Sequence, residues 1–172
     1  MGAANLADFA FLSIGANLPS SAGSPVDTLK RAVEELRDLS DASLMVSPFY
    51  ESDPKDCPPG SPRYCNAVIG LAPPRHIGAI DLLLQLQEIE SEFGRVRSGV
   101  VNEARTLDLD ILTFPGTTSG TKQLTLPHPR AHERRFVLEP WIALVGPYWL
   151  LAGCTLGAWL SACTDPPLVE IR

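Results

Sequence analysis

The sequence predicts an α+β fold of the ferredoxin-like type, in which a βαββαβ core forms an antiparallel sheet. Two segments with helical periodicity alternate with four strand-like segments in the order strand-helix-strand-strand-helix-strand. The 172 residues suffice for one domain and are few for two, so we expect a single domain over residues 1–172. Hydrophobic residues make up 45% and charged residues 20% of the chain, a balance typical of globular proteins. We expect the helices on one face of the sheet, followed by a C-terminal extension.

The first half of the core consists of a strand, a helix and a second strand. Residues 8–16 are mostly apolar and predict the first strand. A helix begins after Ser24, because serine is a good capping residue and Pro25 suits the first helical position. Apolar residues then recur at three- and four-residue steps. Residues 44–50 predict the second strand, in which Pro48 indicates an edge or a bulge.

The second half of the core follows a proline-rich loop. Four prolines and a glycine predict a loop over residues 52–63. Periodicity then predicts a strand at 64–71, a helix at 79–93 that ends before Gly94, and a strand at 107–114. In the extension we expect a strand at 123–126 and helices at 133–144 and 156–163.

Charge and composition exclude several classes of protein. The formal net charge of −6 argues against a general binder of nucleic acid or of membrane surfaces. Residues 141–164 carry no charge, but Gly146-Pro147 interrupts them, so we expect two short buried elements and no membrane span. The four cysteines show no C-x-x-C spacing, and no basic residue precedes the first apolar run. We therefore expect a cytoplasmic protein with reduced thiols, a monomer or else a weak dimer.

The strongest local signal for chemistry is a pair of aspartates in the strand at 107–114. Asp108 and Asp110 point to the same side of a strand, about 6 to 7 Å apart. At an effective dielectric constant near 20, two carboxylates at that distance repel each other by about 2.5 kcal/mol. A cation between them removes this cost, and Mg²⁺ often binds through one or two carboxylates and substrate phosphates. The alternative is a strand whose polar face simply meets water.

Arginines flank this strand in a chain that is otherwise acidic. Eleven of the fourteen basic residues are arginine, and six of these lie in two short stretches: Arg95, Arg97 and Arg105, then Arg130, Arg134 and Arg135. Guanidinium groups bind phosphate through two parallel hydrogen bonds. An aspartate pair beside these arginines predicts a polyphosphate site, whereas the alternative is that the arginines only aid solubility. His128 is a better candidate for a phosphate contact than for a zinc pair with His132, because no third ligand stands nearby.

Together these residues resemble the 6-hydroxymethyl-7,8-dihydropterin pyrophosphokinase family over about residues 10–160. The resemblance rests on the segments 13–18 (SIGANL), 46–52 (VSPFYES), 64–68 (YCNAV), 94–97 (GRVR), 105–112 (RTLDLDIL), 124–129 (LTLPHP) and 134–138 (RRFVL). It implies transfer of pyrophosphate from ATP to the hydroxymethyl group of 6-hydroxymethyl-7,8-dihydropterin, giving AMP and the pterin diphosphate, in folate biosynthesis. It further implies two Mg²⁺ ions with ATP as co-substrate, and no nucleic-acid or membrane partner.

The resemblance also assigns roles to individual residues. Asp108 and Asp110 match the metal ligands, and Arg95, Arg97 and Asp110 match catalytic positions. The positions that match ATP contacts are Gln87, Glu90, Arg95, Arg97, Arg105, Ile111, Leu112, Thr125, His128 and Arg134. The positions that match pterin contacts are Ser52, Tyr64, Asn66, Asp108 and Phe136. Tyr64 and Phe136 would stack on the pterin ring and Asn66 would bind its polar edge; without the resemblance, both aromatics would be ordinary core residues.

The sequence departs from the family pattern in two loops. Asn102 stands where the family often has a tryptophan, so we expect the loop 94–105 to close over substrates mainly through arginine-phosphate contacts. Asp53 stands where proline is common, and residues 55–57 are more polar than usual. Two other functions share the aspartate pair: a nucleotidyltransferase related to polymerase palms, and a nucleotide-binding module without catalysis. The aromatic-Asn-aromatic set argues against the first, and the intact aspartates and arginines argue against the second.

Overall fold

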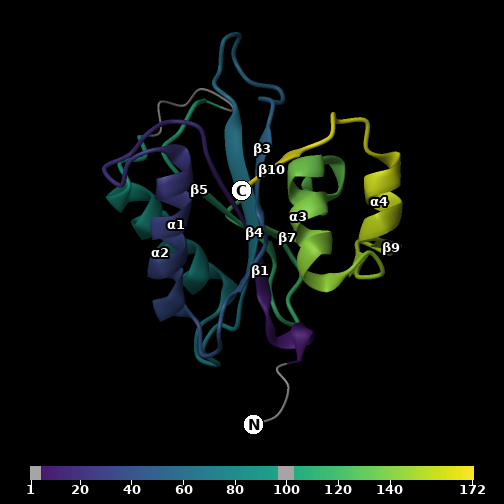
Figure 1. Ribbon diagram of the computed structural model, residues 1–172. Coiled ribbons are helices and arrows are strands. Elements are labelled where there is room, and N and C mark those ends of the chain that lie inside the picture. Colours follow the sequence, from purple (N-terminus) through teal and green to yellow (C-terminus); the bar gives the residue numbers. More distant parts are fainter. Residues whose placement is uncertain (1–4, 97–102) are drawn as a thin grey trace.

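A six-stranded antiparallel sheet lies at the centre of the computed structural model, which describes residues 5–96 and 103–172 (Figure 1). Its strands follow the order β10-β3-β4-β1-β5, and β2 pairs with β4 as well. The strands are β1 (Ala10–Ala16), β2 (Met45–Val46), β3 (Phe49–Ser52), β4 (Tyr64–Leu71), β5 (Asp108–Thr113) and β10 (Val169–Ile171). The predicted α+β class and the antiparallel sheet are confirmed.

Helices cover both faces of this sheet. The core helices α1 (Pro25–Leu36) and α2 (Ala79–Glu92) lie on one face, and α3 (Arg135–Val145) and α4 (Leu156–Ala162) of the extension lie on the other (Figure 1). Along β1, Leu12 packs towards α1 and α2, whereas Phe11 packs towards Trp141 of α3. Because successive side chains of a strand point to opposite faces, a sheet covered on both sides needs apolar residues at every position of its central strand. This explains why β1 is almost continuously apolar.

The extension contains the strand expected at 123–126 and three short strands that the sequence did not predict. The expected strand is β7 (Thr125–Leu126), which pairs with β6 (Ser119–Gly120), and β8 (Leu150–Leu151) pairs with β9 (Cys154–Thr155). Ala152 and Gly153 join β8 to β9 with φ angles of 50° and 80°, as a two-residue hairpin requires. Alanine rarely adopts a positive φ, so the sequence held no clear signal for this turn. No helix in the described part of the chain is long and apolar enough to cross a membrane.

Pro48 breaks the predicted second strand into β2 and β3 at a bulge. Val46 pairs with Ile69 and Tyr50 pairs with Asn66, so the β2–β3 side carries one residue more than β4. Ser47 fills the gap, since its amide donates to the Val68 carbonyl at 3.0 Å and its Oγ accepts from the Val68 amide at 2.9 Å. The bulge therefore determines which residues of β3 face the end of the sheet.

Replacing Ser47 should destabilise the fold through this bulge. Ser47→Ala leaves the buried Val68 amide without its acceptor, which we expect to cost about 1–3 kcal/mol in the free energy of unfolding measured in urea. The control is Ser61→Ala, because Ser61 Oγ only donates to the Pro58 carbonyl in an exposed turn, and its change should stay within about 0.5 kcal/mol. If both variants unfold at the wild-type urea concentration, the Ser47 hydroxyl does not hold the bulge.

Candidate active site

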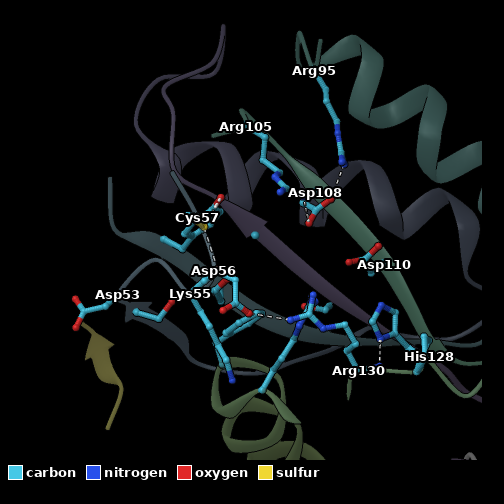
Figure 2. A pocket seen from close by; sticks show the side chains of 18 residues that line it. Asp53, Lys55, Asp56, Cys57, Arg95, Arg105, Asp108, Asp110, His128 and Arg130 are labelled. Carbon is cyan, nitrogen blue, oxygen red and sulfur yellow. Dashed lines mark hydrogen bonds and ion pairs between the residues drawn. The ribbon is translucent and has the colours of Figure 1, made fainter. Parts of the chain in front are cut away.

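A cavity of about 290 Å³ opens on the α3 side of the sheet, where β1 and β3 end and β4 and β5 begin (Figure 2). Most of the residues that line it come from the ends of these strands, from the loop 53–57 and from the segment 128–136 that leads into α3. They are Ser13, Gly15, Ser52, Asp53, Lys55, Asp56, Cys57, Tyr64, Asn66, Arg95, Arg105, Asp108, Asp110, His128, Pro129, Arg130, Arg134 and Phe136. Ten of the residues predicted for the site therefore share one cavity.

The aspartate pair faces the cavity because of the alternation along β5. Leu109 and Ile111 pack into the core beneath α1 and α2, so Asp108 and Asp110 point to the other face and into the cavity. The predicted common side of the two carboxylates is confirmed. Across the β1–β5 pair, Asp108 lies opposite Gly15, which leaves open space beside the carboxylate.

Gly15 also lies opposite Asn66 in the β1–β4 pair, so it separates Asn66 from Asp108 across three neighbouring strands. A Cβ atom at this position would come within 3.0 Å of Asn66 Oδ1. Because Gly15 has no side chain, Asn66 can lie over β1 at this point, and Gly15 itself lines the cavity.

Two arginines converge on Asp108 (Figure 2). Arg95 donates to Asp108 Oδ1, and Arg105 donates to Asp108 Oδ2 at 2.8 Å. Arg95 also pairs with Glu90, a buried residue of α2 whose Oε1 accepts the Leu109 amide at 2.8 Å. Asp108 is thus connected to α2 through Arg95 and Glu90, and to the chain that precedes β5 through Arg105.

Asp110 lies in a different electrostatic environment. Within residues 5–96 and 103–172, no hydrogen bond or ion pair reaches its carboxylate. Burial, and next the negative charge of Asp108, raise the pKa of Asp110 from 3.8 to about 7. At neutral pH the surroundings of Asp110 therefore disfavour the negative charge of its carboxylate, and a bound cation would stabilise that charge.

Arg134 and His128 supply further polar groups to the cavity. Burial, and then the charge of Arg130, lower the pKa of Arg134, so this guanidinium lies in a site that an anion would stabilise. Burial and the two arginines also lower the pKa of His128 to about 4, which keeps its ring neutral at pH 7. Because His128 Nδ1 accepts the Arg130 amide at 3.1 Å, the ring proton lies on Nε2 and is available as a donor.

The other half of the cavity holds two aromatic residues and a buried amide. Tyr64 at the start of β4 and Phe136 at the start of α3 both line it. Asn66 is only 4% exposed, and its Nδ2 donates to Ser52 Oγ at 2.8 Å. Arg134 lies over the Phe136 ring, with 5.5 Å between Cζ and the ring centroid. This half combines flat apolar surfaces with a fixed amide, as recognition of a planar heterocycle requires.

Some predicted residues do not line the cavity. Gln87 and Thr125 are exposed outside it, Ile111 is buried beneath α1 and α2, and Leu112 packs towards α3; their assignment to ATP stays a prediction. Glu90 contacts the site through Arg95, and Arg97 and Asn102 lie outside the described residues. Arg130, which the sequence analysis placed in the arginine cluster, also lines the cavity. Lys55, Asp56 and Cys57 were not assigned to the site, because residues in long loops reach it through contacts that no local spacing indicates.

Because Asp108 and Asp110 lie in different environments, replacing each by asparagine should change the free energy of unfolding in opposite directions. In the absence of divalent cations at pH 8, Asp110→Asn should raise the melting temperature by about 2–4 °C, or about 1 kcal/mol, because it removes a disfavoured charge. Asp108→Asn should lower the stability by at least about 1 kcal/mol, because it weakens the pairing of Arg95 and Arg105.

The pH dependence gives the control for this pair of variants. Since the pKa of Asp110 is raised in the folded state, wild type loses stability as the pH rises from about 4 through about 7, and the advantage of Asp110→Asn should vanish below about pH 4. Melting curves between pH 4 and pH 8 measure this. A destabilised Asp110→Asn protein at pH 8 would contradict the assignment.

Comparison with known proteins supports one family. The family model described as 7,8-dihydro-6-hydroxymethylpterin-pyrophosphokinase matches residues 11–146. A 2-amino-4-hydroxy-6-hydroxymethyldihydropteridine pyrophosphokinase of Haemophilus influenzae is 39% identical over 132 residues, which cover 76% of this chain and 78% of that protein. The enzyme of the same name from Pseudomonas aeruginosa is 36% identical over 154 residues, or 89% and 90% of the two chains. The one from Bacillus subtilis is 34% identical over 134 residues, or 77% and 75%.

Proposed function

Because the chain belongs to the 7,8-dihydro-6-hydroxymethylpterin pyrophosphokinase family and is an ATP-dependent diphosphotransferase of folate biosynthesis, we propose that this cavity carries its reaction. ATP donates its terminal pyrophosphate to the hydroxymethyl group of the dihydropterin, and AMP is released. The observation that supports this site is the meeting of the aspartate pair, four cationic or donor residues and the aromatic-amide set in one cavity. The donors are Arg95, Arg105, His128 and Arg134; the aromatic-amide set is Tyr64, Asn66 and Phe136.

Asp108 and Asp110 would hold the magnesium, as two ions. Their donor set fits, because both carboxylates face the cavity and the raised pKa of Asp110 marks a site that a cation would stabilise. No cluster of three metal-ligating side chains occurs within the described residues, so phosphate oxygens and water would complete the coordination, as is common for Mg²⁺. When bound, Mg²⁺ neutralises charge on the triphosphate and on the leaving phosphate.

The arginines and His128 bind and orient the triphosphate. Arg105 and Arg95 contact Asp108, and Arg134 and His128 line the same cavity. As His128 is neutral, it donates a hydrogen bond from Nε2 without adding charge. Arg97 is proposed as a further phosphate contact from its place in the family pattern alone.

The dihydropterin would lie between Tyr64 and Phe136, with its polar edge on Asn66. Gly15 lies between Asn66 and Asp108 in the sheet and has no side chain. The substituent of a ring bound at Asn66 can therefore extend over Gly15 towards the aspartates. The hydroxymethyl oxygen forms a bond to the β-phosphorus, and the bond from that phosphorus to the oxygen of the α-phosphate breaks. Positioning of both substrates supplies much of the rate enhancement in such transfers.

The activity test uses the aspartate pair. Asp108→Ala and Asp110→Ala should each lower the turnover of ATP and dihydropterin by at least about 10²-fold at saturating Mg²⁺, because each removes a metal ligand. The assay follows AMP and the pterin diphosphate together by chromatography. The control is Glu34→Gln, an exposed α1 residue paired with Arg37, which should retain wild-type turnover.

The product pattern separates the alternatives. A nucleotidyltransferase would release inorganic diphosphate and keep AMP on its product, and a binding module would release neither product. Wild-type turnover in either aspartate variant would exclude Asp108 and Asp110 as the metal site.

Asn66 provides the test for the pterin half. Asn66→Ala leaves the buried edge of a bound pterin unpaired, at a cost of about 1–3 kcal/mol, and should weaken pterin binding roughly tenfold to a hundredfold. ATP binding should change less than about twofold, because Asn66 lies in the aromatic half of the cavity. Calorimetric titration of each substrate measures both affinities. An equal loss for ATP and pterin would mean that Asn66 acts on the fold and not on the ligand.

A further inference from the structure

Residues 163–171, which we call the C-terminal segment, lie beyond the residues that the family model matches and yet contact a residue that lines the cavity. The segment leaves α4 and returns to the sheet, where β10 becomes the strand next to β3 (Figure 1). Val169 pairs with Glu51 and Ile171 with Phe49, so the segment lies along the strand that ends in Ser52.

Asp165 connects this segment to two separate parts of the cavity wall. Its Oδ1 lies 2.7 Å from Lys55 Nζ in the loop 53–57, and its Oδ2 accepts the Arg135 amide at 3.1 Å. Only 15% of the Asp165 side chain is exposed. Burial alone would raise the pKa of this carboxyl, but the hydrogen bonds from Lys55 and Arg135 lower it below its ordinary value. Asp165 is therefore charged, paired and fixed at neutral pH.

The contact with Arg135 determines how α3 begins. Arg134, the N-cap residue of this helix, makes no side-chain cap hydrogen bond. Asp165 supplies the missing acceptor from a distant part of the chain and places a negative charge at the positive end of the helix. Phe136 is the next residue of α3, so Asp165 also restricts the position of the aromatic ring that lines the cavity.

The contact with Lys55 connects the loop 53–57 to Asp165 and so to the start of α3. Lys55 Nζ donates to the Glu133 carbonyl at 2.9 Å as well, so one ammonium group joins the loop, the C-terminal segment and the chain before α3. A second cavity of about 150 Å³ is lined by Phe136, Pro166 and Pro167. Because apolar packing is incomplete there, directed polar contacts must set the distance between α3 and the loop.

We propose that Asp165 is a positioning residue for the pterin. By holding the start of α3 against Lys55, Asp165 keeps Phe136 at the separation from Tyr64 at which a planar ring fits between the two. The inference rests on the proposed binding of the pterin between these two rings. Aromatic stacking requires a narrow range of separations, so a small shift of α3 weakens it. Of the residues proposed to bind ATP and its magnesium, Asp108, Arg95 and Arg105 are held from α2 and from the chain that enters β5, and only Arg134 stands at the start of α3, before the amide that Asp165 accepts. ATP binding should therefore depend less on Asp165 than pterin binding does.

The experiment measures both affinities in a set of full-length variants. Asp165→Asn keeps an acceptor for the Arg135 amide and removes the ion pair, and Lys55→Met removes the same ion pair from the loop. Each should weaken binding of the dihydropterin about tenfold and that of ATP less than about twofold. The double variant should bind pterin no more weakly than Lys55→Met alone, because the ion pair that Asp165→Asn removes is already lost in Lys55→Met. Glu170→Gln, an exposed change in the same segment, should bind both substrates as wild type does.

Phe136→Ala distinguishes failure of this inference from failure of the site. If Phe136→Ala weakens pterin binding while Asp165→Asn and Lys55→Met bind it as wild type, Asp165 has no positioning role. Equal losses of pterin and ATP affinity in Asp165→Asn and Lys55→Met would make the role one of general stability and would also overturn the proposal. If Phe136→Ala binds pterin as tightly as wild type, the stacking site is wrong and the inference falls with it.

Discussion

Asp108 accepts hydrogen bonds from Arg95 and Arg105, and each arginine is tied to a different part of the chain. Arg95 is held by Glu90 of α2, which also accepts the amide of Leu109. The amide of Arg105 donates to the Asn17 side chain after β1, and its carbonyl accepts the Asn17 amide. One carboxylate thus joins a helix and two strands at the point where the cavity opens. The charge of Asp108 is balanced by these contacts, whereas burial and the charge of Asp108 raise the pKa of Asp110 next to it to about 7.

This division of charge depends on a sheet that is covered on both faces. The core beneath α1 and α2 takes up Leu109 and Ile111, which forces the two aspartates towards the α3 side. On that side the extension supplies Arg134 and Phe136 at the start of α3. The βαββαβ core therefore carries the carboxylates proposed to bind the metal, while a helix outside the core completes both halves of the cavity. Neither part alone forms the cavity.

The central position of Gly15 relates the two halves to each other. It is the neighbour of Asn66 on one side and of Asp108 on the other, so the group proposed to bind the pterin and a group proposed to bind magnesium are separated by one strand. Two inter-strand spacings of roughly 4.8 Å each, about 10 Å together, set the scale of this separation. A planar bicyclic ring together with its hydroxymethyl group can span such a distance, which suits transfer to a substituent of a planar substrate.

The sequence by itself determined the order of helices and strands in the core, an irregularity at Pro48 and the common side of Asp108 and Asp110; the structure decided that the irregularity is a bulge. These features follow from the periodicity of apolar residues and from the fixed φ angle and missing N–H of proline, and both act within a few residues. It also led to the correct family, through segments that carry the chemistry. Only the tertiary structure decided that β10 joins the sheet beside β3, that Ala152 and Gly153 form a hairpin turn, and that Asp165 contacts Lys55. Strand pairing at the edge and ion pairs between loops depend on residues far apart in the chain, so no local pattern specifies them.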